Sequence, residues 1–171
     1  VGNGAAELLY AICRLPGYTG AFVPAPGFSE YKAALEASRI PVRDIYYRPR
    51  EDEHGKPYFE VPYLALETFA AELKGQDGRI IVFLGNPNNP DGTLLDKNHI
   101  RTIASMLKDA NSLLVIDESF IDFVGNDTLQ DNEYSMRSLV NEFDNIIVVH
   151  SFTKFYAVPG LRIGAAFSNP L

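Results

Sequence analysis

The sequence is poor in cysteine, histidine and positive charge. Cys13 is the only cysteine, so no disulfide can form within the chain, and with only three histidines a cysteine-based metal site is excluded. The low cysteine content suits a reducing compartment, and we expect a cytoplasmic protein. Lys and Arg number 15 against 22 Asp and Glu, a formal net charge of -7. This is the wrong sign for holding a nucleic-acid backbone, so nucleic acid is not an expected partner.

Long apolar runs are also lacking. No run approaches the ~20 residues that cross a bilayer, so a membrane partner is not expected either. The 171 residues are 46% hydrophobic and 22% charged, which is typical of one globular domain. The chain begins at Val1, inside what reads as a motif, without an initiator Met or an apolar leader. We therefore expect residues 1–171 to be one domain cut from a longer protein.

Helix and strand patterns alternate along the chain. Continuous apolar runs at 80–84, 113–116 and 146–149 are typical of strands covered on both faces. Such alternation predicts right-handed βαβ units around a mostly parallel sheet, an α/β fold. We expect strands at 21–23, 42–47, 80–84, 113–116 and 146–149. We expect helices at 7–12, at 29–38 with Ser29 as its cap, and at the apolar stripes 66–73, 100–107 and 136–143. Residues 50–57 are expected to form an exposed loop.

Polar residues follow three of these strands, where open parallel sheets bind ligands. The segments are Asn-Pro-Asn-Asn-Pro-Asp-Gly at 86–92, Asp-Glu-Ser-Phe at 117–120 and His-Ser-Phe-Thr-Lys at 150–154, with Arg162 eight residues after Lys154. Taken singly, each has an ordinary structural explanation as a turn, a helix cap or a solvated charge. His150 is either a ligand-contacting residue or a polar residue that ends a strand.

Two nucleotide-binding interpretations lack a phosphate cradle. Leu-Leu-Val-Ile-Asp-Glu at 113–118 resembles the acidic strand of a P-loop nucleotidase, but no Gly-x-x-x-x-Gly-Lys-Ser/Thr occurs in the chain. Gly-Asn-Gly at 2–4 supplies only two glycines of a dinucleotide fingerprint, with no strand predicted before it.

The motifs together resemble a known family. Gly-Asn-Gly at 2–4, Pro-Gly-Phe at 26–28, Asn-Pro-Asp-Gly at 89–92, the strand-end Asp117, and Ser-x-x-Lys at 151–154 with Arg162 resemble the class I/II aminotransferases, fold-type I enzymes that use pyridoxal phosphate. The resemblance covers nearly the whole chain and implies the large, cofactor-binding domain, a three-layer α/β sandwich. Segments 2–4, 117–123 and 151–164 look most like the threonine-phosphate decarboxylases of the cobalamin pathway, with histidinol-phosphate aminotransferases as close relatives.

The resemblance also implies catalytic roles. Lys154 would hold the cofactor aldehyde as a Schiff base, and Asp117 would keep the pyridine nitrogen protonated so that the ring can accept electrons. Asn89 would donate to the ring 3-oxygen. Phe28 would stack on the ring face, although an ordinary core aromatic is an equal alternative.

The cofactor's phosphate would need a cation, hydroxyls and free backbone amides. By the same resemblance, Arg162, Ser151 and Thr153 would supply the first two, and the Asn3–Gly4 turn that opens the first helix would supply the amides.

The chain departs from the family pattern at two positions. Asp91 stands where the family usually has Thr, and Phe120 stands where most of the aminotransferases have Tyr. Because Phe at this place is a feature of the decarboxylase branch, we expect α-decarboxylation of a small amino acid, of which a phosphorylated one is an example. Transamination is the second interpretation.

A non-catalytic relative that keeps only the fold is a third interpretation. The joint presence of Lys154, Asp117, Asn89 and Arg162 argues against it. The resemblance further implies a homodimer in the full-length protein. It places an N-terminal arm and a C-terminal small domain, which carries a substrate-binding arginine, outside residues 1–171.

Overall fold

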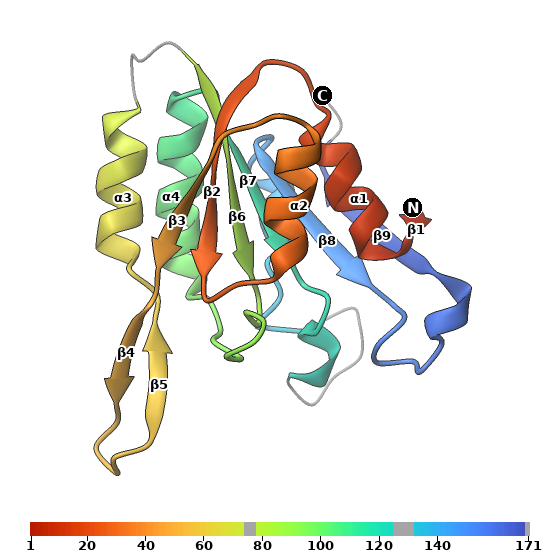
Figure 1. Cartoon of the computed structure of the whole chain (residues 1–171). Helices are drawn as coiled ribbons and strands as arrows, with labels where there is room; N and C mark the ends of the chain where they lie inside the picture. Colours follow the sequence, from red (N-terminus) through yellow and green to blue (C-terminus); the bar gives the residue numbers. More distant parts are fainter. Residues whose placement is uncertain (74–77, 125–131, 170–171) are drawn as a thin grey trace.

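A seven-stranded sheet forms the centre of the computed structural model, which describes residues 1–73, 78–124 and 132–169 (Figure 1). Its strands are β1 (Gly2–Asn3), β2 (Tyr18–Ala25), β3 (Val42–Tyr46), β6 (Arg79–Gly85), β7 (Leu113–Asp117), β8 (Ile146–Ser151) and β9 (Ile163–Ser168). Their order is β1-β9-β8-β7-β6-β2-β3. The pairs from β3 to β8 are parallel, and β9 pairs antiparallel with both β8 and β1. The predicted α/β class with a mostly parallel sheet is confirmed.

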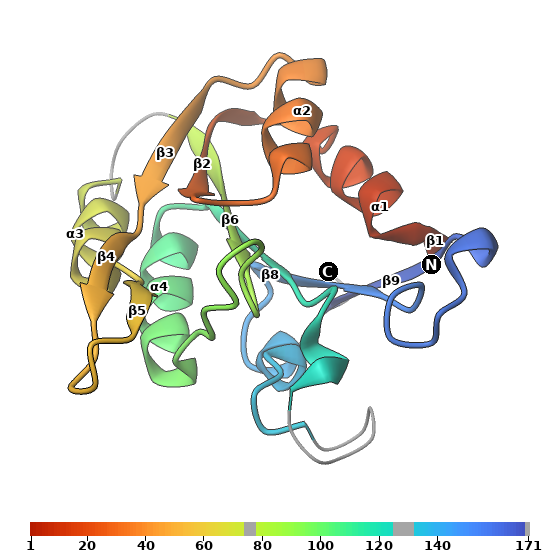
Figure 2. The same cartoon turned by 60° about the horizontal axis from the view of Figure 1, so that its bottom comes forward.

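Helices cover both faces of this sheet and make it the middle of three layers. The helices α1 (Gly4–Cys13) and α2 (Ser29–Ala37) lie on one face, and α3 (Tyr63–Glu72) and α4 (Lys97–Asp109) lie on the other (Figures 1 and 2). The sheet has a hydrophobic core on each face, and alternate residues of β6 point into one or the other. Ile81 and Phe83 pack with α1 and α2, whereas Ile80, Val82 and Leu84 pack with α3 and α4. This two-sided burial explains why the strand is a continuous apolar run.

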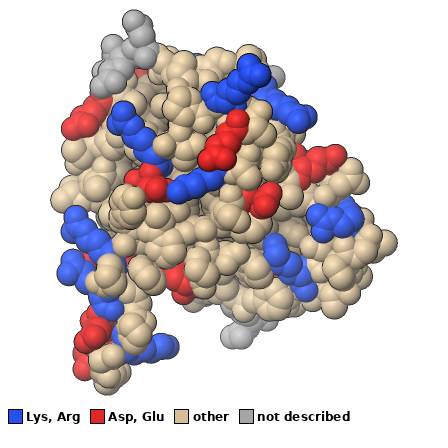
Figure 3. All heavy atoms as spheres, in the orientation of Figure 1, with Lys and Arg blue, Asp and Glu red and all other residues tan. Residues whose placement is uncertain are grey.

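The segment 50–57 is not the predicted loop. Strands β4 (Arg48–Glu51) and β5 (Pro57–Glu60) pair antiparallel in a separate two-stranded hairpin. Its turn is made by Asp52, whose Oδ1 accepts backbone N–H groups from His54 and Lys56, and by Gly55 at φ +74°. The hairpin projects from the body and carries side chains of both charge signs (Figure 3). The exposure is as predicted, but local turn chemistry pairs the two flanks.

Two helix predictions are wrong in detail. Ser29 is the first residue of α2 rather than its cap, because Phe28 takes the N-cap position and no side chain caps this end. The stripe at 136–143 contains only a short 3-10 helix, η2 (Arg137–Asn141). The amides of Leu139 and Glu142 donate to the carbonyls three residues earlier, those of Met136 and Leu139, which is the bonding of a 3-10 helix. Met136 and Leu139 are nevertheless buried, as the stripe predicts.

The polar segments follow the carboxyl ends of β6, β7 and β8. These ends lie at one edge of the sheet, the lower edge in Figure 1, which is turned toward the reader in Figure 2. Two further 3-10 helices, η1 (Ile121–Phe123) and η3 (Pro159–Leu161), lie in the segments after β7 and β8. Among the helices of the described residues, none combines the length and apolar content needed to cross a membrane.

Candidate active site

A small cavity of about 30 Å³ lies at the carboxyl ends of β6 and β7. Its lining comes from four segments: Phe28 and Tyr31 from the start of α2, Pro87 and Asn89 after β6, Asp117, Ser119 and Phe120 at the end of β7, and Lys154 after β8. The structure therefore brings together four of the predicted site residues, Phe28, Asn89, Asp117 and Lys154, together with the unusual Phe120.

The Asp117 carboxylate is held by two donors. Asp117 ends β7, and its side chain is buried. The backbone N–H of Ser119 donates to Oδ1 at 2.9 Å, and the hydroxyl of Tyr31 donates to Oδ2 at 3.0 Å. Because each carboxylate oxygen can accept more than one hydrogen bond, Asp117 keeps capacity to accept one from a ligand.

Lys154 follows β8 and extends over Phe120. Its Nζ lies 4.4 Å from the centroid of the Phe120 ring. Burial lowers the pKa of Lys154, Asp117 opposes this effect, and the charge of Arg162 adds to it. A lowered pKa increases the fraction of neutral amine, which is the form that attacks an aldehyde.

A second group of predicted residues lies where β8, β9 and α1 meet. The hydroxyls of Ser151 and Thr153 are buried and lie 2.9 Å apart. Ser151 is in register with Gly164 of β9, and a Cβ built on Gly164 would come within 2.7 Å of the Gly4 carbonyl carbon. Arg162 precedes β9, and a Cβ on Gly4 would come within 3.0 Å of its Nη2. Gly4, Ser151, Thr153 and Arg162 thus supply a close backbone approach, hydroxyls and a cation at one corner.

Asn3 is placed beside this corner, but its donors are engaged. Its backbone N–H donates to Glu7 Oε2 at 2.5 Å, and its Nδ2 donates to Glu7 Oε1 at 3.0 Å. The Glu7 carboxylate therefore takes two of the donors expected to face a phosphate. An anion that uses Asn3 must first displace Glu7.

Glu118, next to Asp117, is fully buried and was not singled out by the sequence. Its carboxylate accepts from Asn86 Nδ2 at 3.2 Å, Ser135 Oγ at 2.7 Å and the Met136 backbone N–H at 2.5 Å. Burial raises the pKa of Glu118, and these three donors oppose the rise. The contacts attach the segment around Ser135 and Met136 to the strand end that carries Asp117.

Asp91 does not place its charge in the cavity. Its carboxylate accepts from Asn88 Nδ2 and from the Thr93 hydroxyl, within the turn that follows β6. The cavity lining includes Asn89 but not Asp91. The departure from Thr at this position therefore leaves the ring site without an added carboxylate.

His150 is not part of the cavity lining. It is 1% exposed, and its Nε2 is 3.0 Å from Asp122 Oδ2, close enough for an ion pair but not in hydrogen-bond geometry. Burial lowers the pKa of His150, whereas Asp122 opposes this effect.

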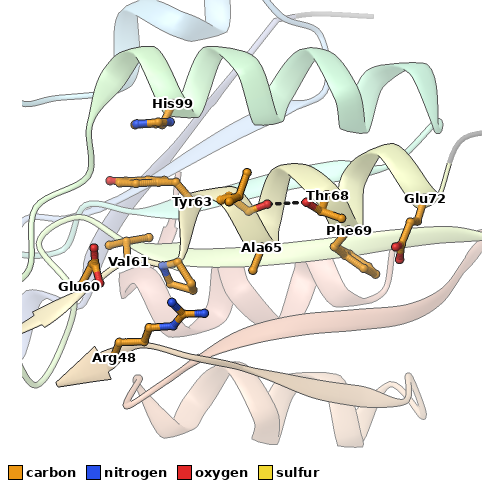
Figure 4. A pocket seen from close by; sticks show the side chains of 11 residues that line it. Arg48, Glu60, Val61, Tyr63, Ala65, Thr68, Phe69, Glu72 and His99 are labelled. Atoms are coloured by element: carbon orange, nitrogen blue, oxygen red, sulfur yellow. Dashed lines mark hydrogen bonds between the residues drawn. The ribbon is translucent and has the colours of Figure 1, made fainter.

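A larger cavity of about 680 Å³ lies elsewhere, between the hairpin and the helices α3 and α4 (Figure 4). Its lining includes Arg48, Tyr63, Thr68 and His99 but none of the predicted site residues. Polar groups there contact one another: the His99 ring stacks on the Tyr63 ring with centroids 4.3 Å apart, and His99 Nδ1 pairs with Glu67 Oε1. Size alone therefore does not identify the site.

The residues at the small cavity fit pyridoxal phosphate chemically. They offer an amine of lowered pKa, a buried carboxylate with free acceptor capacity, an amide and three aromatic rings, and the corner at β8 and β9 adds a cation and hydroxyls. The side-chain oxygen of the neighbouring Asn88 is buried without a hydrogen-bond partner among the described residues. The cavity volume of about 30 Å³ is that found with the Lys154 side chain in its lining.

Comparison with known proteins agrees with this chemistry. The family Aminotransferase class I and II matches residues 1–170. A putative threonine-phosphate decarboxylase of Caldanaerobacter subterraneus subsp. tengcongensis is 32% identical over 99% of this chain and 42% of its own length. Histidinol-phosphate aminotransferase 1 of Trichormus variabilis is 31% identical over 99% of this chain and 41% of its own length. The chain thus spans less than half the length of these curated relatives.

Solved structures share the fold. The histidinol-phosphate aminotransferase of Clostridium acetobutylicum superimposes with a TM-score of 0.77 at 25% identity, covering 98% of this chain and 44% of that one. A PLP-bound C-S lyase of Staphylococcus hominis gives a TM-score of 0.76 at 18% identity, covering 99% of this chain and 41% of that one. The chain belongs to the class I and II aminotransferase family, whose cofactor is pyridoxal 5'-phosphate.

Proposed function

We propose that residues 1–171 are the cofactor-binding large domain of a decarboxylase that acts on a small phosphorylated amino acid, of the threonine-phosphate type. The observation that carries the choice is Phe120, which lines the cavity with its ring 4.4 Å from Lys154 Nζ. Most aminotransferases of the family have Tyr at this position. The two kinds of relative are 32% and 31% identical to this chain, so overall identity does not separate them.

In this proposal the two catalytic residues act on different ends of the ring. Lys154 supplies the amine that attaches the cofactor, aided by its lowered pKa. Asp117, buried and fixed by two donors, holds a proton on the ring nitrogen. Pyridoxal phosphate held by these two residues would supply the electron sink for cleavage of a bond at the substrate α-carbon.

The remaining residues bind and orient. Asn89 would donate to the ring oxygen of the cofactor, and Phe28, the N-cap residue of α2, would pack on the ring; both residues line the cavity. The corner formed by Gly4, Ser151, Thr153 and Arg162 would hold the phosphate, and Asn3 would add its donors once they leave Glu7.

Transamination of a histidinol-phosphate type of substrate is the second candidate. It is favoured by the relatives and the solved structure that carry that name. Which bond is cleaved depends on groups that grip the substrate carboxylate, since the bond held perpendicular to the ring is the one that breaks.

A homodimer of the full-length protein is part of the proposal. Phe123, Phe155 and Tyr156 are 60%, 47% and 46% exposed in the segments that carry Phe120 and Lys154, and aromatic side chains are enriched at protein interfaces. Light scattering of the full-length protein should give the mass of two chains; the mass of one chain would remove the dimer from the proposal.

The experiment that tests the function has two parts, both on the full-length protein. Borohydride reduction of the cofactor-loaded protein should fix pyridoxyl mass on Lys154 in a peptide map. The mass should be lost in Lys154→Ala and retained in Lys56→Ala, which removes an exposed lysine of the hairpin. A panel of amino acids and their phosphates is then assayed for carbon dioxide against keto acid. Mass at another lysine overturns the site, and keto acid without carbon dioxide overturns decarboxylation.

A further inference from the structure

We propose that Tyr31 is a positioning residue, whose hydroxyl holds the Asp117 carboxylate in place and keeps the shared proton on the cofactor's ring nitrogen. The inference rests on the proposed function of Asp117. Tyr31 and Asp117 are 86 residues apart in the sequence, and their hydrogen bond joins α2 to the end of β7.

The ring of Tyr31 is fixed by packing before its hydroxyl is considered. Tyr31 is 1% exposed. Its ring stacks on Phe83 of β6, with centroids 5.3 Å apart and planes 15° apart. The edge contact with Phe28 has centroids 5.6 Å apart and an angle of 87°. These contacts hold the hydroxyl toward Asp117 without requiring the hydrogen bond to do so.

The hydroxyl acts as a donor in this pair. Burial raises the pKa of Tyr31 well above its ordinary value, and the neighbouring Asp117 charge adds to the rise. Tyr31 therefore stays protonated, and an ionised carboxylate can only accept. The proton of the hydrogen bond belongs to Tyr31.

Donation to Oδ2 favours the ionised form of Asp117. With Tyr31 on Oδ2 and the Ser119 amide on Oδ1, both oxygens are stabilised as anions. A proton shared with a ring nitrogen then stays on the nitrogen, which is the form that accepts electrons. Without the hydroxyl, one buried oxygen loses its donor, and the proton is drawn toward the carboxylate.

The test uses Tyr31→Phe in the full-length, cofactor-loaded protein. This variant keeps the ring that packs on Phe83 and removes only the hydroxyl. Tyr47→Phe is the matched control, because Tyr47 is also buried and its hydroxyl bonds to no group within the described residues. Circular dichroism and thermal melting confirm that both variants fold.

Two measurements report on the ring nitrogen and on binding. With pyridoxal phosphate labelled with ¹⁵N in the ring, Tyr31→Phe should move the nitrogen resonance toward its unprotonated position. The Tyr31–Asp117 hydrogen bond is formed with and without the cofactor, so its loss acts on affinity only through the position of the carboxylate, and the dissociation constant should rise by less than about tenfold. Tyr47→Phe should leave both values at those of the wild type.

Repeating the measurement in an Asp117→Asn variant distinguishes a role of Tyr31 through Asp117 from a role in packing alone. If Tyr31 acts through the Asp117 carboxylate, then adding Tyr31→Phe to Asp117→Asn should change neither the resonance nor the dissociation constant further. An equal effect in both backgrounds overturns the proposal, as does a wild-type resonance in the single variant. Failure of the wild-type protein to take up the cofactor overturns the proposed function and this role with it. Normal uptake with an unaltered variant overturns the role of Tyr31 alone.

Discussion

The α-carbon of Gly4 lies directly against the guanidinium of Arg162. A Cβ placed on Gly4 would come within 3.0 Å of Nη2 and 3.4 Å of Cζ. The two residues are distant in sequence, and they meet because β1 pairs with β9, with Asn3 opposite Ile163. Gly4 also has φ +82°, a left-handed conformation that other residues adopt only at a cost. The proposed phosphate corner therefore depends on the absence of a side chain at this position.

We predict that Gly4→Ala weakens both the fold and cofactor binding. The positive φ should lower the free energy of unfolding by about 1–2 kcal/mol. The added methyl group should also displace the guanidinium, so the dissociation constant of the cofactor should rise by about tenfold or more. Urea denaturation and a fluorescence titration with pyridoxal phosphate measure the two effects.

Gly55→Ala separates the two effects. Gly55 has φ +74° and open space around its α-carbon, and it lies in the hairpin turn away from the site. Its replacement should cost similar stability and leave cofactor affinity unchanged. Wild-type affinity in Gly4→Ala would contradict the assignment of this corner to the phosphate.

We predict that Asp117→Asn leaves part of the cofactor binding but reduces the reaction rate severely. A neutral amide keeps the size of the side chain, yet it cannot hold the proton on the ring nitrogen, so the electron sink is lost. Steady-state kinetics of the full-length protein measure the rate, and absorbance of the bound cofactor measures occupancy. Asp91→Asn is the matched control: its carboxylate is held within the turn by Asn88 and Thr93, so the rate should change little. An unchanged rate in Asp117→Asn would leave this residue only a structural role at the strand end.

The strand ends could be predicted from the sequence, and so could the position of Asp117 at one of them. Apolar runs at 80–84 and 113–116 mark strands buried on both faces, and the polar residue that follows each run is then at the ligand-binding edge. Tyr31 could not be found in this way. It lies three residues after Phe28, one helical turn along α2, but which face of α2 meets β7 is decided only by packing.

Glu118 shows a second limit of sequence reasoning. A carboxylate after a strand is typical of a solvated group, yet Glu118 is 0% exposed. Its partners Ser135 and Met136 lie 17 and 18 residues further along the chain, beyond any local pattern. The hairpin at 48–60 was missed for a local reason, since its Gly and charged residues are also typical of loops.

We predict that Glu118 makes stability fall as pH rises. Burial raises its pKa in the folded protein above the ordinary value of 4.5. The folded state then binds the proton more tightly than the unfolded state, so the contribution to the free energy of unfolding decreases as pH rises from 4.5 through the folded pKa. In Glu118→Gln this titration is absent. Urea denaturation between pH 4 and 8 should show the wild type losing stability relative to Glu118→Gln as pH rises.

For Glu142→Gln we expect the opposite result: the wild type should gain stability relative to this variant as pH rises. The hydrogen bond from Arg101 lowers the pKa of this exposed carboxylate, so its contribution is present above the ordinary value of 4.5 and is lost as pH falls through the folded pKa. A parallel pH dependence for the wild type and Glu118→Gln would show that the buried carboxylate is fully compensated by Asn86, Ser135 and Met136.

The last prediction concerns Phe120, on which the choice of decarboxylation rests. In the aminotransferases that this chain resembles, a Tyr hydroxyl here donates to the 3-oxygen of the cofactor and favours its ionised form. Phe120 lines the cavity beside Lys154, so its ring is next to the proposed position of the cofactor. A hydrogen bond to a charged group is worth about 1.5–3 kcal/mol, and one pH unit corresponds to about 1.4 kcal/mol.

We therefore predict that Phe120→Tyr in the full-length protein shifts the visible absorbance titration of the bound cofactor toward lower pH by about one to two units. Phe123→Tyr is the matched control. The Phe123 ring lies 6.3 Å from Phe120 and is not part of the cavity lining, so its added hydroxyl should stay outside the cavity and leave the titration unchanged. Thermal melting accompanies both titrations. A Phe120→Tyr variant that loses stability while its titration stays at the wild-type midpoint would place the new hydroxyl in an unpartnered, buried position. That result would remove Phe120 from the cofactor's surroundings, and decarboxylation would lose its support over transamination.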